Sequence, residues 1–158
     1  NMVVKANGFR SIQRTHRGVL IYLQLNDWPT DVPLPQGVML GETGEGPFSP
    51  YCDLILKNDQ TIQAIVGWFI IPLALSETIA WYQVEMAKQD WAYQADKSSR
   101  LAESAILRFE QLTTSLRAMI DLRARSHILQ TDAMIRRIVV HPWAPVAEQP
   151  LELTAEIA

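Results

Sequence analysis

The chain has 158 residues, which is the length of one ordinary domain. Hydrophobic residues make up 48% of the chain and charged residues 20%, a balance that excludes a largely disordered protein. The formal net charge of −3 and the pI near 5.6 disfavour a dedicated nucleic-acid binder, because such proteins are usually basic.

The cysteine count and the N-terminal residues bear on the cellular compartment. Cys52 is the only cysteine, so neither an intramolecular disulfide nor a zinc site built on paired cysteines can form. Residues 1–18 lack the apolar core that a signal peptide needs. We therefore expect a single domain over residues 1–158 that resides in the cytoplasm.

Residues 18–71 are expected to be mainly β-structure. The apolar stretch over residues 18–25 favours a strand, and a loop rich in proline and glycine follows over residues 27–50. Apolar residues alternate with other residues from 52 to 56, which indicates a second strand. The pair Asn58-Asp59 is a turn signal, and it joins this strand to an apolar return strand in a hairpin.

Residues 73–95 have the periodicity of a helix, and Pro72 suits its first turn. This helix has apolar residues on two sides, so it needs one partner for each side, such as a sheet and a second helix or a partner chain. The first side carries Trp81, Val84, Trp91 and Ala95, and the opposite side carries Ile79, Tyr82, Met86 and Tyr93.

A second helix is predicted over residues 101–120, where apolar residues recur at i, i+3, i+4 and i+7. The serines at 98–99 lower helix propensity, and whether helices 73–95 and 100–125 are continuous stays open. A third helix is predicted over residues 128–139, although its last residues would also suit a strand.

The expected fold class is therefore α+β. A small antiparallel sheet from residues 18–71 packs against two or three long helices, arranged as a helical hairpin, from residues 73–140. Prolines end regular structure in a tail over residues 141–158.

No catalytic constellation emerges from the residues. His16, His127 and His141 are scattered without metal-ligand spacing, and the glycine-rich loop at 41–46 lacks the Lys-Ser/Thr ending of a phosphate-binding loop. Cys52 falls on an inward-facing side of its predicted strand, where a thiol is unreactive. We assign no catalytic residue, expect neither a metal nor a cofactor, and lean towards a protein that is not an enzyme.

Two groups of side chains are candidate binding residues. Large aromatic side chains suit a protein interface or a ligand pocket, and arginine suits phosphate and carboxylate groups. Core packing and solvated surface charge are the competing interpretations of the two groups. The interface or ligand candidates are Trp81, Tyr82, Val84, Met86, Trp91 and Tyr93, and the anion-binding candidates are Arg117, Arg123, Arg125, Arg136 and Arg137.

The leading functional hypothesis is a non-enzymatic interaction or assembly protein that self-associates, most simply as a dimer, through the aromatic-rich helix. One alternative is a small-molecule-binding protein or small enzyme with a Trp/Tyr-lined pocket. Another is a nucleic-acid-associated accessory protein that uses the arginines. A membrane partner is not expected, because the uncharged run over residues 61–76 is shorter than the ~20 residues of a helical span.

Overall fold

The computed structural model describes residues 2–5, 11–15, 18–44, 46–57, 59–111 and 114–142. Most of these residues lie in extended strands, and a single α-helix, α1 (Leu75–Lys88), occurs among them. The strands are β1 (Met2–Lys5), β2 (Ser11–Thr15), β3 (Gly18–Tyr22), β4 (Met39–Leu40), β5 (Glu42–Thr43), β6 (Gly46–Pro47), β7 (Tyr51–Lys57), β8 (Gln60–Ile71), β9 (Ala92–Tyr93), β10 (Ser99–Arg100), β11 (Ser104–Gln111), β12 (Leu116–Ala124) and β13 (Thr131–Pro142).

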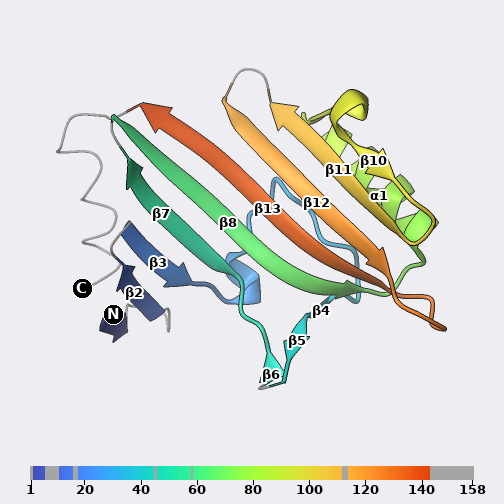
Figure 1. Cartoon of the computed structure of the whole chain (residues 1–158), viewed down its shortest axis with the longest axis horizontal. Helices are drawn as coiled ribbons and strands as arrows, with labels where there is room; N and C mark the ends of the chain where they lie inside the picture. Colours follow the sequence, from blue (N-terminus) through green and yellow to red (C-terminus); the bar gives the residue numbers. More distant parts are fainter. Residues whose placement is uncertain are drawn as a thin grey trace.

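One large antiparallel sheet holds nearly all the strands, in the order β1-β2-β3-β7-β8-β13-β12-β11-β10 (Figure 1). The two longest strands, β8 and β13, pair along their whole length in the middle of the sheet. β4 pairs with β8 beyond the end of β7, and β9 pairs with β11 beside β10. β5 and β6 form a separate small hairpin.

The predicted α+β fold class, with two or three long helices in a helical hairpin, is wrong. Residues 101–120 contain β11 and part of β12, which form a β-hairpin, and residues 128–139 contain most of β13. In the region expected to be helical over 73–95, the helix covers only Leu75–Lys88. In the first half, β7 and β8 do pair as a hairpin with Lys57 opposite Gln60, although Asn58 lies outside the described residues.

Apolar residues on both faces of two strands produce the misleading helical pattern. The buried side chains of β11 alternate at Ala105, Leu107 and Phe109, as expected for a strand. Ile106 and Met119 point to the opposite face, and they complete an accidental i, i+3, i+4 spacing. Pairing with neighbouring strands overrides the modest helix propensity of such residues.

The core lies on one face of the sheet, which we call the inner face. It is covered by α1, which lies behind β10 and β11 in Figure 1, and by residues 25–38. Tyr82 and Met86 of α1 are fully buried against the sheet. The sheet contributes Phe69 and Ile71 from β8, Ala133, Ile135 and Val139 from β13, Leu116, Ala118, Ile120 and Leu122 from β12, and Ala105, Leu107 and Phe109 from β11.

Hydrogen bonds connect the start of α1 to the sheet. The buried Thr78 hydroxyl donates to the Ala74 carbonyl at 2.9 Å, and Thr131 of β13 donates to the Leu73 carbonyl at 2.8 Å. After Lys88 the chain reverses at Asp90, whose φ of 66° is left-handed. The reversal returns Trp91 to the core, so neither of the two predicted apolar sides of the helix continues beyond Lys88.

The edge of the sheet at β11 is protected. β9 and β10 pair with the two ends of β11, and between them the Gln94 amide donates to the Arg108 carbonyl at 2.8 Å. The Arg108 amide in turn donates to the Ser98 hydroxyl at 2.9 Å. Because these backbone groups are already bonded, this edge is a poor template for adding another strand.

Candidate binding surface on the outer sheet face

The second face of the sheet, which we call the outer face, carries a mixed set of apolar, aromatic and charged side chains. Residues paired directly in register point to the same face of a sheet. The register therefore places Trp68 beside Met134 and Met134 beside Asp121 on the outer face, opposite the core. α1 and residues 25–38 lie on the inner face, so neither covers this surface.

A hollow of about 580 Å³ lies at one end of the outer face. Its floor is made by outward side chains of β8 and β13, and one wall comes from the segment of β4, β5 and β6. It combines a large apolar floor with both signs of charge at its rim. The lining residues are Gly41, Glu42, Phe48, Trp68, Ile70, Asp121, Arg123, Arg125, Asp132, Ala133 and Met134.

Three aromatic rings form the apolar side of this surface. Phe48 packs edge-on against Trp68 with ring centroids 4.6 Å apart, and the Tyr51 ring lies 6.0 Å from the same Trp68 ring. Burial is the main cause that raises the pKa of the Tyr51 hydroxyl, followed by Asp53, whereas Arg136 lowers it. In register, Tyr51 and Arg136 flank Val66 on the outer face, so the aromatic side of the surface leads towards a guanidinium group.

Two arginine–aspartate pairs lie at the rim of the hollow. The Arg123 Nε and Asp121 Oδ1 are 3.9 Å apart, and the Arg125 Nε and Asp132 Oδ1 are 3.4 Å apart. The Arg123 side chain is 75% exposed, and exposed pairs of this kind contribute at most about 1 kcal/mol. Each arginine is therefore only weakly held by its aspartate.

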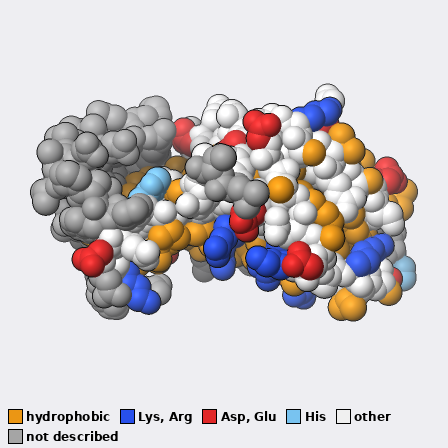
Figure 2. All heavy atoms as spheres, turned by 90° about the horizontal axis from the view of Figure 1, so that it is seen from above, with side chains coloured by type: hydrophobic (Ala, Val, Ile, Leu, Met, Phe, Trp, Pro, Cys, Tyr) orange, Lys and Arg blue, Asp and Glu red, His pale blue; other side chains and the backbone are white. Residues whose placement is uncertain are grey.

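A second set of arginines surrounds Met119, and we call Arg108, Arg117 and Arg136 the arginine cluster. Met119 is directly opposite Arg108 on one side and Arg136 on the other, and Arg117 is two residues along the same strand. All three arginines are exposed, and none makes an ion pair within the described part of the chain. In Figure 2, Lys and Arg side chains gather along the lower margin of the molecule, interspersed with acidic groups.

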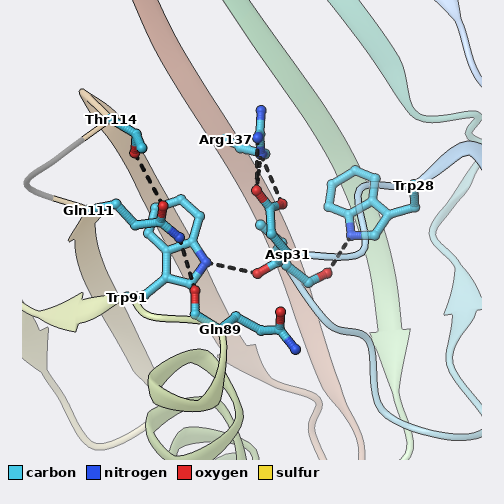
Figure 3. Close-up of polar contacts among 8 residues, drawn as sticks. Trp28, Asp31, Gln89, Trp91, Gln111, Thr114 and Arg137 are labelled. Atoms are coloured by element: carbon cyan, nitrogen blue, oxygen red, sulfur yellow. Dashed lines mark hydrogen bonds and ion pairs between the residues drawn. The ribbon is translucent and has the colours of Figure 1, made fainter.

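The structure separates Arg137 from the other anion-binding candidates. Arg117, Arg123, Arg125 and Arg136 lie on or beside the outer face, whereas Arg137 points to the inner face. There its guanidinium makes two-pronged hydrogen bonds of 2.8–3.1 Å to the Asp31 carboxylate (Figure 3). Arg137 is thus a structural residue that ties residues 25–38 to β13.

The aromatic-rich candidates of the predicted first helix do not form one patch. Tyr82, Met86 and Trp91 are core residues, with at most 3% of each exposed, and Trp81 is half-buried against the core. The Trp91 indole donates to the Asp31 carbonyl at 2.8 Å (Figure 3). Val84 and Tyr93 are exposed, and the Tyr93 ring, from β9, packs on the Phe109 ring of β11.

The comparisons with known proteins identify no relative. Neither a protein-family model, nor a curated protein, nor a solved structure matches the chain. No helix among the residues that the structure describes has the length and apolar character to cross a membrane. The same residues contain no group of three or more His, Cys, Asp or Glu side chains suited to hold a metal ion.

Several residues of the outer surface were outside the sequence-based candidates. Phe48 follows a glycine-rich loop and carried no binding signal. Arg108 and Met119 fall within the segment that the sequence pattern assigned to a helix. Alternation of buried positions, with Arg108 between Leu107 and Phe109 and Met119 between Ala118 and Ile120, was the signal that could have found them.

Proposed function

We propose that the chain is a non-enzymatic binding protein whose outer face takes a partner that carries both a flat apolar group and negative charge. The observation that carries the proposal is the hollow in which Phe48 and Trp68 lie beside Arg123 and Arg125. Sites that bind small molecules combine apolar and aromatic walls with a few polar groups that orient the ligand. Guanidinium groups supply a forked donor set for carboxylate or phosphate.

The unreactive Cys52 thiol and the side chains that line the hollow support a binding role over a catalytic one. Burial, followed by Asp53, raises the pKa of the Cys52 thiol to about 11, so the neutral thiol predominates at neutral pH. The hollow contains acids, arginines and apolar groups, and no cysteine, serine or histidine side chain lines it. This composition suits recognition.

Calorimetric titration with 2-naphthoate tests the proposal, because this compound is flat, apolar and anionic. The uncharged 2-naphthalenemethanol is the matched ligand that lacks the carboxylate. We expect the wild-type protein to bind 2-naphthoate more tightly than the alcohol. Trp68→Ala should abolish binding of both compounds. The double variant Arg123→Gln with Arg125→Gln should still bind both compounds and lose only the preference for the carboxylate.

Tyr93→Ala is the control for the loss of an aromatic ring, because Tyr93 is exposed away from the hollow. If wild-type protein binds neither compound, the proposal is wrong. Unchanged affinity in both Trp68→Ala and the double arginine variant would contradict it as well, and circular dichroism will show whether each variant remains folded.

Self-association is a second candidate function, favoured by the turn between β12 and β13. Ile128 and Leu129 are adjacent there, and 52% and 77% of their surfaces are exposed. Adjacent exposed aliphatic side chains are common at protein contacts. Light scattering after size-exclusion chromatography should show a dimer for the wild type. The double variant Ile128→Ser with Leu129→Ser should be a monomer. A monomeric wild type would exclude this candidate.

A further inference from the structure

We infer that the partner of the outer face is a single-stranded nucleic acid. The inference rests on the proposed function and adds the class of partner. It depends on the way that the register joins two surfaces, the hollow with its aromatic rings and the arginine cluster, into one continuous path across the sheet.

The path begins at the aromatic rings. The Trp68 ring lies 4.6 Å from the Phe48 ring and 6.0 Å from the Tyr51 ring, and all three residues are half-buried, which leaves part of each side chain accessible. Aromatic rings on an open surface are the usual stacking platform for unpaired bases, and stacking tolerates any base because every base has a flat face.

The arginine cluster continues the path. Tyr51 and Arg136 flank Val66 in register, and Met119 separates Arg136 from Arg108 in the same row. From β8 to β11 the path crosses three inter-strand spacings, about 14 Å, which corresponds to a few nucleotides of a single strand. Because the three guanidinium groups have no ion-pair partner in the described part of the chain, a backbone of phosphates would supply their counter-charge.

Acidic groups on the same face set a limit on affinity. Asp53 and Glu110 lie on the outer face, with Glu110 directly opposite Arg117, and Asp121, Asp132 and Glu42 lie around the hollow. The surface is therefore balanced in charge, and the attraction is local to the arginine cluster. A duplex hides its base faces from the aromatic rings, so it should bind more weakly than a single strand.

Fluorescence anisotropy with labelled oligonucleotides of about 12 nucleotides tests the inference. The probes are oligo-dT, oligo-rU and a DNA duplex of the same length. We expect both single strands to bind and the duplex to bind at least tenfold more weakly. With about three phosphate contacts, the dissociation constant for a single strand should rise roughly tenfold between about 50 and 150 mM salt.

Arg117→Gln with Arg136→Gln is the decisive variant, because both side chains are exposed and their loss leaves no buried partner. It should weaken oligonucleotide binding about tenfold or more and leave 2-naphthoate binding unchanged. The double variant Lys88→Gln with Lys97→Gln removes the same charge from exposed positions in α1 and in the turn before β10. These positions belong to neither the hollow nor the arginine cluster, so this variant should bind oligonucleotide normally.

The outcomes separate the two proposals. If 2-naphthoate binds and the single strands do not, the inference is wrong and the binding function stands, whereas failure of both ligands overturns both. Equal binding of duplex and single strand, or equal loss in the lysine control, would also overturn the inference because it would show only general attraction between charges. Binding of free nucleoside monophosphates as tight as that of oligonucleotides would overturn it in favour of a small-molecule ligand.

Discussion

Asp31 and Arg137 are separated by 106 residues in the chain and meet in a two-pronged ion pair, with the Arg137 Nη2 2.8 Å from the Asp31 Oδ2. Only 16% of the arginine side chain and 28% of the aspartate side chain are exposed. The pair joins an irregular segment rich in proline to the centre of the sheet. Trp28 and Trp91 strengthen the junction by donating indole hydrogen bonds to the Val32 and Asp31 carbonyls at 2.8 Å (Figure 3).

Loss of the Asp31–Arg137 pair should destabilise the protein. We expect Asp31→Asn to lower the free energy of unfolding by about 1–3 kcal/mol, because hydrogen bonds to a charged group contribute in this range and the guanidinium is left half-buried. Urea unfolding measures the change. Glu85→Gln, which breaks the exposed Lys88–Glu85 pair, is the matched control and should change stability by at most about 0.5 kcal/mol. Equal effects of the two substitutions would contradict the structural role of the pair.

Gly67 is required because Trp28 packs directly on its backbone. A Cβ at this position would lie 2.6 Å from the Phe69 ring and 2.8 Å from the Trp28 ring. Gly67→Ala should therefore destabilise the protein by about 1–3 kcal/mol, the usual range for overpacking in a core. Gly44→Ala is the control, because nothing lies within 4 Å of the added methyl group. Thermal unfolding of both variants tests the difference, and equal melting temperatures would refute it.

The hydroxyl of Tyr82 is buried without a hydrogen-bond partner among the described residues. Burial raises the pKa of Tyr82, so the hydroxyl stays neutral throughout the ordinary pH range. Because an unsatisfied buried polar group is unfavourable by about 1–3 kcal/mol, Tyr82→Phe should leave stability unchanged or increase it. Destabilisation of more than about 1 kcal/mol in urea would show that the hydroxyl is satisfied in solution. Tyr93→Phe at the surface should be neutral.

The Cys52 thiol should be unreactive in the folded protein. Its pKa is raised to about 11 from 9.0, mainly by burial and then by Asp53, so its thiolate fraction near pH 8 is about a hundredfold below that of an ordinary thiol. Since the folded protein favours the neutral thiol, this contribution to stability is fully present below about pH 9 and is lost as the pH rises towards 11.

Alkylation with iodoacetamide checks this prediction. The native protein should react about a hundredfold more slowly than the unfolded protein near pH 8. Stability of the wild type should fall from about pH 9 to pH 11 relative to Cys52→Ala. Rapid alkylation under native conditions, or the same pH profile for both proteins, would contradict the burial of the thiol.

The hairpin of β7 and β8 could be read from local sequence, whereas β1, β2 and the short strands within residues 39–47 could not. Apolar strands and turn residues lie next to one another in the hairpin of β7 and β8, so the pattern over residues 51–71 contains most of the information that pairs them. The helix could also be located, because the apolar positions Tyr82 and Met86 follow helical spacing, although it begins at Leu75 and Pro72 lies before its first turn. Its end at Lys88 could not, since the reversal depends on the left-handed conformation of Asp90.

The second half depends on contacts between distant residues. β13 returns to pair with β8, so the sheet forms only when residues 60 to 82 positions apart meet, and this pairing converts a helix-like pattern into strands. The same pairing gathers Arg108, Arg117 and Arg136 around Met119 and sends Arg137 to the opposite face. A list of arginines in the sequence cannot distinguish these two environments.

The central claim is that the outer face around Trp68 is a binding surface, and indole signals in a ¹H–¹⁵N spectrum test it most directly. The indoles of Trp28 and Trp91 are bonded inside the protein, and Trp68 lines the hollow. Titration with 2-naphthoate should shift the Trp68 signal, assigned with Trp68→Phe, and leave the signals of Trp28 and Trp91 in place. An unmoved Trp68 signal at saturating ligand, or shifts confined to Trp28 and Trp91, would contradict the claim.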